Sequence, residues 1–235
     1  MIIMAFDSTA KSASVAVLDG EHVLAEYNID NGLTQSELLL PMAEDMLRAL
    51  KLSFSDVELF ACSRGPGSFT GVRIGVSLVK GLAFGRGVPC VGVSTLESLA
   101  ESLRGLRGII VPVMDARRDQ VYTAIFSSDG DELVRRTEDM AVSHSALAEM
   151  LRDTEDRIYL VGDGYGVTKR ALDALGIKTE ATPERLRPQS AASVGAVAYR
   201  KYKIGEAVDD LIISPTYLRM PQAERERLER EAAKQ

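Results

Sequence analysis

The residues best suited to do chemistry lie in a glycine-rich stretch, residues 64–75, which reads Arg-Gly-Pro-Gly-Ser-Phe-Thr-Gly-Val-Arg-Ile-Gly. It joins an apolar run at residues 57–62, typical of a strand, to an apolar-periodic run at residues 72–84, typical of a helix. Such a turn leaves unpaired N–H groups at the positive end of the helix, where an anion can bind. A candidate anion or nucleotide loop therefore comprises Gly65, Pro66, Gly67 and Ser68. The alternative is a plain sharp turn, which also needs glycine.

Two acidic residues end apolar runs and could serve a nucleotide cleft. Asp7 is followed by Ser8 and Thr9, so an acid that orients magnesium or water stands beside hydroxyls that could meet phosphate. Asp7 could equally bond its own turn. Asp115 precedes a pair of cations, Arg117 and Arg118, which could contact phosphate or tRNA or could be a solvated hairpin entry. Residues 162–164, Gly-Asp-Gly, could shape an adenosine pocket or form an ordinary turn.

Common catalytic and metal-binding patterns are absent from the sequence. No lysine follows the last glycine of residues 64–75, so this is not a Walker A motif. His22 and His144 are the only histidines and stand in dissimilar contexts, which is too few for a histidine-based metal site. Cys62 and Cys90 form no C-x-x-C, and no G-x-S-x-G elbow occurs. The sequence therefore predicts no catalytic residue and no bound metal.

Composition and charge narrow the class of protein. The chain has 235 residues, 46% of them hydrophobic and 26% charged, with a net charge of −6. That charge supplies no global field for nucleic acid, so we expect no DNA partner, and any RNA contact needs a local basic patch. No apolar run is long enough to span a bilayer, and the first residues lack a signal-peptide pattern. We expect a cytoplasmic protein with no membrane partner.

The order of expected elements repeats once along the chain. Each half is predicted as three strands, a helix, a strand, a helix, a strand and a helix. Asp7 and Asp115 end the two first strands, and Asp-Gly turns at residues 19–20 and 129–130 close the two hairpins. This order predicts a tandem duplicated ribonuclease-H-like (actin-like ATPase, ASKHA) α/β fold, with a mixed five-stranded sheet flanked by helices in each half. The predicted domains are residues 1–105 and 106–220, followed by a charged helical or disordered tail at residues 221–235.

Two helices of the first half carry more apolar residues than one narrow stripe. A capping box at Thr34 and Glu37 opens the first helix, which we expect to be kinked or interrupted at Pro41. The excess could be buried against the domain's own sheet or could form a protein–protein interface. The candidate partner residues on these two helices are Leu38, Leu39, Met42, Met46, Leu50, Val72, Arg73, Val76, Val79 and Ala83.

Five segments together resemble the TsaB (YeaZ) family of bacterial tRNA threonylcarbamoyladenosine biosynthesis. They are residues 4–9 (Met-Ala-Phe-Asp-Ser-Thr), 36–41 (Ser-Glu-Leu-Leu-Leu-Pro), 65–75, 115–122 (Asp-Ala-Arg-Arg-Asp-Gln-Val-Tyr) and 215–219 (Pro-Thr-Tyr-Leu-Arg). The resemblance covers residues 1 to about 220 in the same order, and Gly-Pro-Gly-Ser-Phe-Thr-Gly is its most specific part. It implies the duplicated fold and a non-catalytic subunit, a paralogue of the threonylcarbamoyltransferase TsaD.

The resemblance also implies partners. TsaD, which modifies adenosine 37 of ANN-decoding tRNA, would be activated by heterodimer formation through the first-domain helices. The pair would form a docking platform for the ATPase TsaE, and the chain alone would homodimerise weakly through the same face. Nucleotide and tRNA would be met only in the assembled complex. TsaD keeps a metal-binding histidine pair on the helix that here begins Gln35-Ser36-Glu37, so that site is not carried over. The alternatives are an ATP-dependent phosphotransferase using Asp7 and Asp115, and a metallopeptidase.

Overall fold

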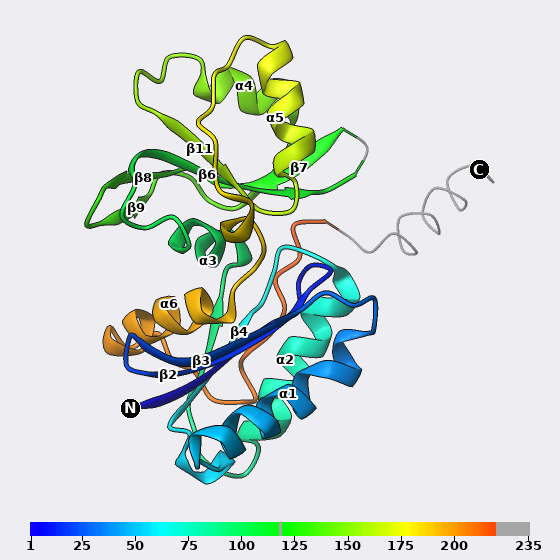
Figure 1. The fold of residues 1–235 in the computed structure, drawn as a ribbon, viewed down its shortest axis with the longest axis vertical. Coiled ribbons are helices and arrows are strands. Elements are labelled where there is room, and N and C mark those ends of the chain that lie inside the picture. The colour runs from blue at the N-terminus through cyan, green and yellow to red at the C-terminus, as the bar shows by residue number, and fades with distance from the viewer. Residues whose placement is uncertain (118, 220–235) are drawn as a thin grey trace, which may run out of the picture.

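The structure is a computed structural model that describes residues 1–117 and 119–219. Arg118 and the predicted tail at residues 221–235 lie outside the described residues. The chain forms two α/β halves that are stacked along the long axis of the molecule (Figure 1). Within the described ranges, no helix has the length and apolarity to cross a membrane.

The first sheet has five strands in the order β3-β2-β1-β4-β5. Strands β1 (Ile2–Asp7), β2 (Ala13–Asp19) and β3 (His22–Ile29) form an antiparallel meander, and β4 (Leu59–Ser63) and β5 (Cys90–Val93) continue it in parallel with β1. Hairpin and crossover connections produce these two pairings respectively. This order is that of the predicted ribonuclease-H-like fold.

The second sheet has six strands rather than the five predicted. They are β6 (Arg107–Asp115), β7 (Gln120–Thr123), β8 (Phe126–Asp129), β9 (Leu133–Arg135), β10 (Met140–Ser143) and β11 (Ile158–Val161). Strands β7 and β8 pair with β6 in one register, and the break between them lies opposite Pro112, which has no N–H to donate. The strand predicted near Ile177 is reduced to a single bridge between Tyr159 and Glu180. The second sheet thus repeats the first with interrupted strands.

Three helices cover each sheet, but the third helix of each half crosses to the other half (Figure 1). Helices α1 (Gln35–Leu50) and α2 (Phe69–Ala83) cover one face of the first sheet, and α6 (Ala191–Lys203) covers the other. Helices α4 (His144–Leu151) and α5 (Tyr165–Ala174) cover one face of the second sheet, and α3 (Thr95–Glu101) covers the other. The ranges 1–105 and 106–220 therefore do not describe how α3 and α6 pack.

The crossing helices also hold the two halves together. Arg200 on α6 forms an ion pair with Glu101 on α3, at 2.6 Å between Nη2 and Oε2, and it bonds Glu21 at 3.1 Å. Lys201 on α6 lies 3.6 Å from Glu97 on α3. Because α3 sits on one sheet and α6 on the other, these pairs fix the relative position of the halves.

Helix α1 follows its predicted start but not its predicted interruption. The capping box of Thr34 and Glu37 is formed, and the helix runs through Pro41 to Leu50 without a break. Pro41 is exposed, so the carbonyl left without its helical partner lies on the solvent side of the helix.

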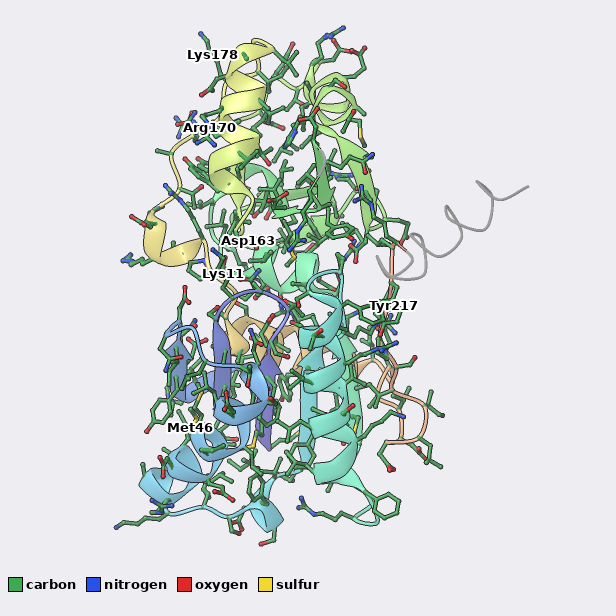
Figure 2. All side chains as sticks on the ribbon, turned by 90° about the vertical axis from the view of Figure 1, so that its right-hand side faces the viewer. Lys11, Met46, Asp163, Arg170, Lys178 and Tyr217 are labelled. Carbon is green, nitrogen blue, oxygen red and sulfur yellow. The ribbon has the colours of Figure 1, made fainter. Side chains whose placement is uncertain are left out.

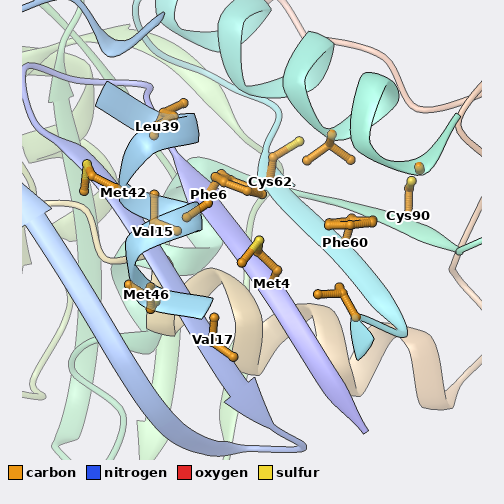
Figure 3. Packing of buried hydrophobic residues seen from close by; sticks show 14 of the residues in the cluster. Met4, Phe6, Val15, Val17, Leu39, Met42, Met46, Phe60, Cys62 and Cys90 are labelled. Carbon is orange, nitrogen blue, oxygen red and sulfur yellow. The ribbon is translucent and has the colours of Figure 1, made fainter. Parts of the chain in front are cut away.

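Most of the predicted partner residues belong to the core of the first half. Met42 and Met46 point toward Phe6, Val15 and Val17 on the sheet (Figure 3). Seven of the ten are buried, namely Leu39, Met42, Met46, Val72, Val76, Val79 and Ala83. Leu38 and Leu50 are half-buried, and only Arg73 is exposed. Of the two alternatives for these seven residues, burial against the domain's own sheet is the one that their packing favours, because the sheet itself uses the wide apolar stripe.

A pair of glycine substitutions tests the packing of α6. A Cβ at Gly195 would overlap Leu18 Cδ1, and Leu18 is fully buried, so its side chain would have to shift among core neighbours. At Gly81, inside α2, an added Cβ meets open space. We expect Gly195→Ala to lower the free energy of unfolding by about 1 kcal/mol net of helix propensity, and Gly81→Ala to raise it by about 0.5–1 kcal/mol. Urea denaturation of both variants measures this, and equal signs would contradict the packing.

Candidate functional site

A cleft of about 710 Å³ opens where the loops of the two halves face each other. Four loops and the end of the described chain form its walls. In Figure 2, Lys11 of the first half and Asp163 of the second half lie close to the level at which the halves meet, and Tyr217 lies near the same level. The lining residues are Thr9, Ala10, Lys11, Gln35, Pro66, Gly67, Ser68, Phe69, Thr70, Val72, Met114, Asp115, Ala116, Arg117, Tyr122, Asp163, Thr216, Tyr217, Leu218 and Arg219. The candidate loops predicted from the sequence thus converge on one cleft.

The glycine loop is fixed by backbone contacts with the turn after β1. Ser68 N donates to Thr9 O at 2.7 Å, and Ser8 Oγ donates to Gly71 O at 2.8 Å. A Cβ at Gly71 would overlap Ser8 O, and one at Gly67 would lie 2.6 Å from Thr9 O. Gly67 also has φ +156, and Gly65 has φ +111 after which a cis peptide bond leads to Pro66. Glycine is required here because two backbones approach more closely than a side chain allows.

This packing limits the loop as an anion site. The Ser68 amide, the first that an anion at the helix start would meet, is already engaged by Thr9. The Ser68 hydroxyl caps α2 by accepting from Gly71 N at 3.3 Å. Pro66, Gly67 and Ser68 line the cleft, whereas Gly65 is buried beneath it. The geometry favours the structural role over the phosphate cradle.

Asp7 is turned inward and does not line the cleft. Its carboxylate accepts hydrogen bonds from Thr9 N at 2.8 Å, from Thr9 Oγ1 at 2.7 Å and from Ser63 Oγ. The side chain is 1% exposed, and burial raises the pKa of this carboxyl above its ordinary value of 3.8, although these hydrogen bonds oppose the shift. Of the predicted trio only Thr9 reaches the cleft, because Ser8 is also buried. Asp7 therefore bonds its own turn and is not aimed at a metal-bound phosphate.

The opposite wall is built by the turn between β6 and β7. Asp115 accepts from Arg117 N at 2.7 Å, which closes a tight turn with Arg117 at φ +61. Asp163, from the loop after β11, faces the same space. Desolvation in the cleft raises the pKa of the Asp163 carboxyl, although a hydrogen bond from the backbone of Asp115 opposes this shift more strongly than the charge of Asp115 adds to it. Among the described residues, the wall thus combines the carboxyl groups of Asp115 and Asp163 with the exposed cation Arg117.

The segment at residues 215–219 bridges the two halves, although the residue pattern of this segment predicts no site residue. Thr216 N donates to Arg64 O at 2.7 Å, next to the glycine loop. Tyr217 packs on Phe69 with ring centroids 4.7 Å apart and accepts from Arg73 Nε at 2.9 Å. Arg219 Nη1 donates to Ala116 O at 2.8 Å in the second half. The motif Pro-Thr-Tyr-Leu-Arg, quoted above only for the resemblance, was the available indication of this strap.

The histidines and cysteines lie outside the cleft. His144 is buried, with Nδ1 2.9 Å from Asp119 Oδ1 and Nε2 3.4 Å from Thr168 Oγ1. Burial raises the pKa of the Cys62 thiol, and that of Cys90 to about 11, so both thiols stay protonated at neutral pH. Among the described residues, no three His, Cys, Asp or Glu side chains gather as a metal site would require.

Comparisons with known proteins agree with this architecture. A sequence model of the TsaD family, described as tRNA N6-adenosine threonylcarbamoyltransferase, matches residues 34–227. TsaB of Bacillus subtilis is 33% identical over 228 residues, which cover 95% of this chain and 96% of that protein. TsaB of Escherichia coli is 33% identical over 168 residues, which cover 70% and 72%. The structure of YeaZ from Pseudomonas aeruginosa has a TM-score of 0.76 at 26% identity and covers 92% of this chain and 99% of that one.

Two halves of one topology that face each other across a cleft define a duplicated ribonuclease-H-like protein. Within that class, the extent of the similarity identifies the family. The chain belongs to the TsaB family of tRNA threonylcarbamoyladenosine biosynthesis proteins.

The pH dependence of stability tests the state of Asp7. Because its folded pKa is raised, the folded protein binds more protons than the unfolded chain above pH 3.8, and Asp7 costs stability as pH rises. We expect Asp7→Asn to gain stability relative to the wild type between pH 4 and pH 7. Paired urea denaturation curves at both pH values measure the difference. A difference that is flat or that shrinks with rising pH would mean that the buried carboxylate is stabilised in its charged form.

Proposed function

We propose that the chain is a non-catalytic subunit that forms a heterodimer with a TsaD homologue and thereby activates it for threonylcarbamoyladenosine modification of tRNA. The observation that carries the proposal is similarity over nearly the whole chain to proteins named TsaB. The buried and hydrogen-bonded state of Asp7 supports it. The carboxylate of Asp7 is occupied by Ser63 and Thr9, which leaves it unsuited to bind a metal. In this proposal the protein acts in the cytoplasm, and the heterodimer forms the platform on which a TsaE-type ATPase docks.

The outer face of α1 and α2 is the surface proposed for this contact. With the inward residues packed in the core, α1 presents Leu40, which is 38% exposed, and α2 presents the half-buried Ile74 and Leu78. Ser77 is exposed between them, and Gly81 adds no side chain, so another helix can approach α2 closely. Leu38 and Leu50 of the predicted set are half-buried and pack against the core of the first half. In the absence of the TsaD homologue, a weak homodimer would use the same face.

Surface substitutions test the proposed interface without touching the core. Leu40→Glu places a charge on the apolar face, and Ser77→Arg fills the gap on α2, so both are expected to weaken association at least tenfold. Leu175→Glu is the matched control, because Leu175 is 51% exposed near the end of α5 in the other half. Co-purification with the TsaD homologue of the same organism, followed by measurement of threonylcarbamoyladenosine in tRNA, gives both readouts.

The control must retain association and modification, and all three variants must keep the wild-type melting temperature. Normal co-purification of both Leu40→Glu and Ser77→Arg would place the contact elsewhere. Failure of the wild-type chain to bind or activate the TsaD homologue would refute the proposed function itself.

A phosphotransferase is the second candidate, since the cleft lies where nucleotides bind in duplicated folds of this kind. It requires an acid in the first half that can reach magnesium, and Asp7 is buried and fully hydrogen-bonded. We expect calorimetry of the isolated chain with ATP and magnesium to give no binding in the micromolar range. A stoichiometric micromolar site would favour the phosphotransferase.

A further inference from the structure

An aromatic–guanidinium cluster stands at the mouth of the cleft. The Arg73 guanidinium lies 3.8 Å from the Phe69 ring centroid and 5.8 Å from that of Tyr217. Tyr217 is 41% exposed, which is more than a residue that only fastens the strap needs. Figure 2 shows Tyr217 beside the upper end of α2, at the level of the cleft. The cluster thus presents a flat, partly hydrated π surface next to a positive charge.

Cations continue from this cluster around the cleft. Lys11 lines it from the first half, and Arg117 and Arg219 line it from the second half and the strap. Arg219 lies 5.5 Å from the Tyr122 ring centroid, which repeats the pairing of a guanidinium with an aromatic ring. Within residues 1–117 and 119–219, none of these three side chains, nor Arg73, lies within 4.0 Å of a carboxylate oxygen. Among the described residues that line the cleft, the carboxyl groups that can offset this positive charge are Asp115 and Asp163, which share a wall with Arg117.

We propose that this rim, formed by Lys11, Phe69, Arg73, Arg117, Tyr217 and Arg219, binds a single-stranded segment of RNA. The inference rests on the proposed function, which brings the chain to tRNA, and it assigns to this chain a direct contact with the substrate. Phosphates are held by Lys11 and Arg117, whose side chains are exposed. A base stacks on the exposed face of Tyr217, and Arg73 fixes that ring through its 2.9 Å hydrogen bond.

The chemistry of the rim favours single-stranded RNA over a free phosphate or a duplex. A small anion needs converging donors, and the Ser68 amide at the start of α2 is already engaged. Aromatic rings add nothing for an inorganic phosphate, whereas grooves that combine cations with aromatic rings are the usual site for unpaired nucleotides. A duplex hides its base faces, so Tyr217 could not be used. The net charge of −6 confines any attraction for RNA to a local patch such as this one.

The test uses the chain with its TsaD homologue, and the chain alone, titrated against a fluorescein-labelled RNA hairpin with an anticodon-type loop. Two substitutions are compared with matched controls on the far side of the molecule. Lys11→Glu is paired with Lys178→Glu, and Tyr217→Leu is paired with Tyr202→Leu, because Tyr202 is 39% exposed on α6. Figure 2 shows Lys178 at the far end of the second half from Lys11.

We expect Lys11→Glu and Tyr217→Leu each to weaken hairpin binding by about fivefold or more, with the controls unchanged. Lys11→Glu should also reduce the slope of log affinity against log salt by about 0.7 or more, as the loss of one phosphate contact predicts for a single strand. A blunt duplex of equal length should bind weakly to all variants. If inorganic phosphate at low concentration competes with the hairpin and causes an equal loss of hairpin binding, the rim is an anion site and not an RNA site.

The outcome separates this proposal from the proposed function. Co-purification and activation of the TsaD homologue with unchanged hairpin affinity in both variants would overturn the RNA site and leave the subunit role intact. Loss of co-purification in the wild type would instead refute the subunit role. Melting temperatures of Tyr217→Leu and Tyr202→Leu show whether the strap is still seated, and Lys11→Glu, which removes no hydrogen bond of the strap, carries the test if it is not.

Discussion

The carbonyl oxygen of Ser8 occupies the space that a Cβ of residue 71 would need, and much of the first half depends on this approach. It brings the start of α2 against the turn after β1, where Ser68 bonds Thr9 and the Ser8 hydroxyl bonds Gly71. The glycine loop then carries two further contacts, since Gly65 O accepts from Thr95 N at the start of α3 and Arg64 O accepts from Thr216 N. One close backbone contact thus sets the position of α2, of α3 and of the strap.

The exchange of the third helices, α3 and α6, between the two halves holds the whole molecule together. Because α3 lies on the second sheet and α6 on the first, neither half has a complete core without the other. The half-buried Glu101 forms its ion pair with Arg200 across the junction, and separating the halves would expose apolar faces of both helices. Such a junction resists opening and closing of the cleft. A rigid platform suits a subunit that supports a partner better than an enzyme that must close on a nucleotide.

The order of the elements and their hydrophobic periodicity predict much of the fold from the sequence. Contacts between distant segments cannot be predicted in this way. Hairpin turns, capping residues and apolar runs are local features, so the repeated series of elements and the cleft between the halves could be predicted. No local feature of the sequence distinguishes a Met46 that is buried on its own sheet from a Met46 that faces a partner. The apolar stripe of α1 is therefore compatible with both interpretations, and the structure shows that Met46 is buried. The sheet on which α6 packs and the contacts of Tyr217 both involve residues more than 100 positions away in the chain, so no local segment of the sequence predicts them.

The interior of the cleft and its rim differ in how far their polar and aromatic groups are exposed. Asp7 stands where an acid would meet magnesium, yet Ser63 and Thr9 occupy its oxygens and burial raises its pKa, so the inner part of the cleft has become core. The residues of the rim, in contrast, are not buried in this way. Tyr217 is 41% exposed. Arg73 and Arg117 have no carboxylate partners among the described residues. Charge and aromatic surface that are open to solvent around a buried interior are the features on which the proposed contact with RNA rests.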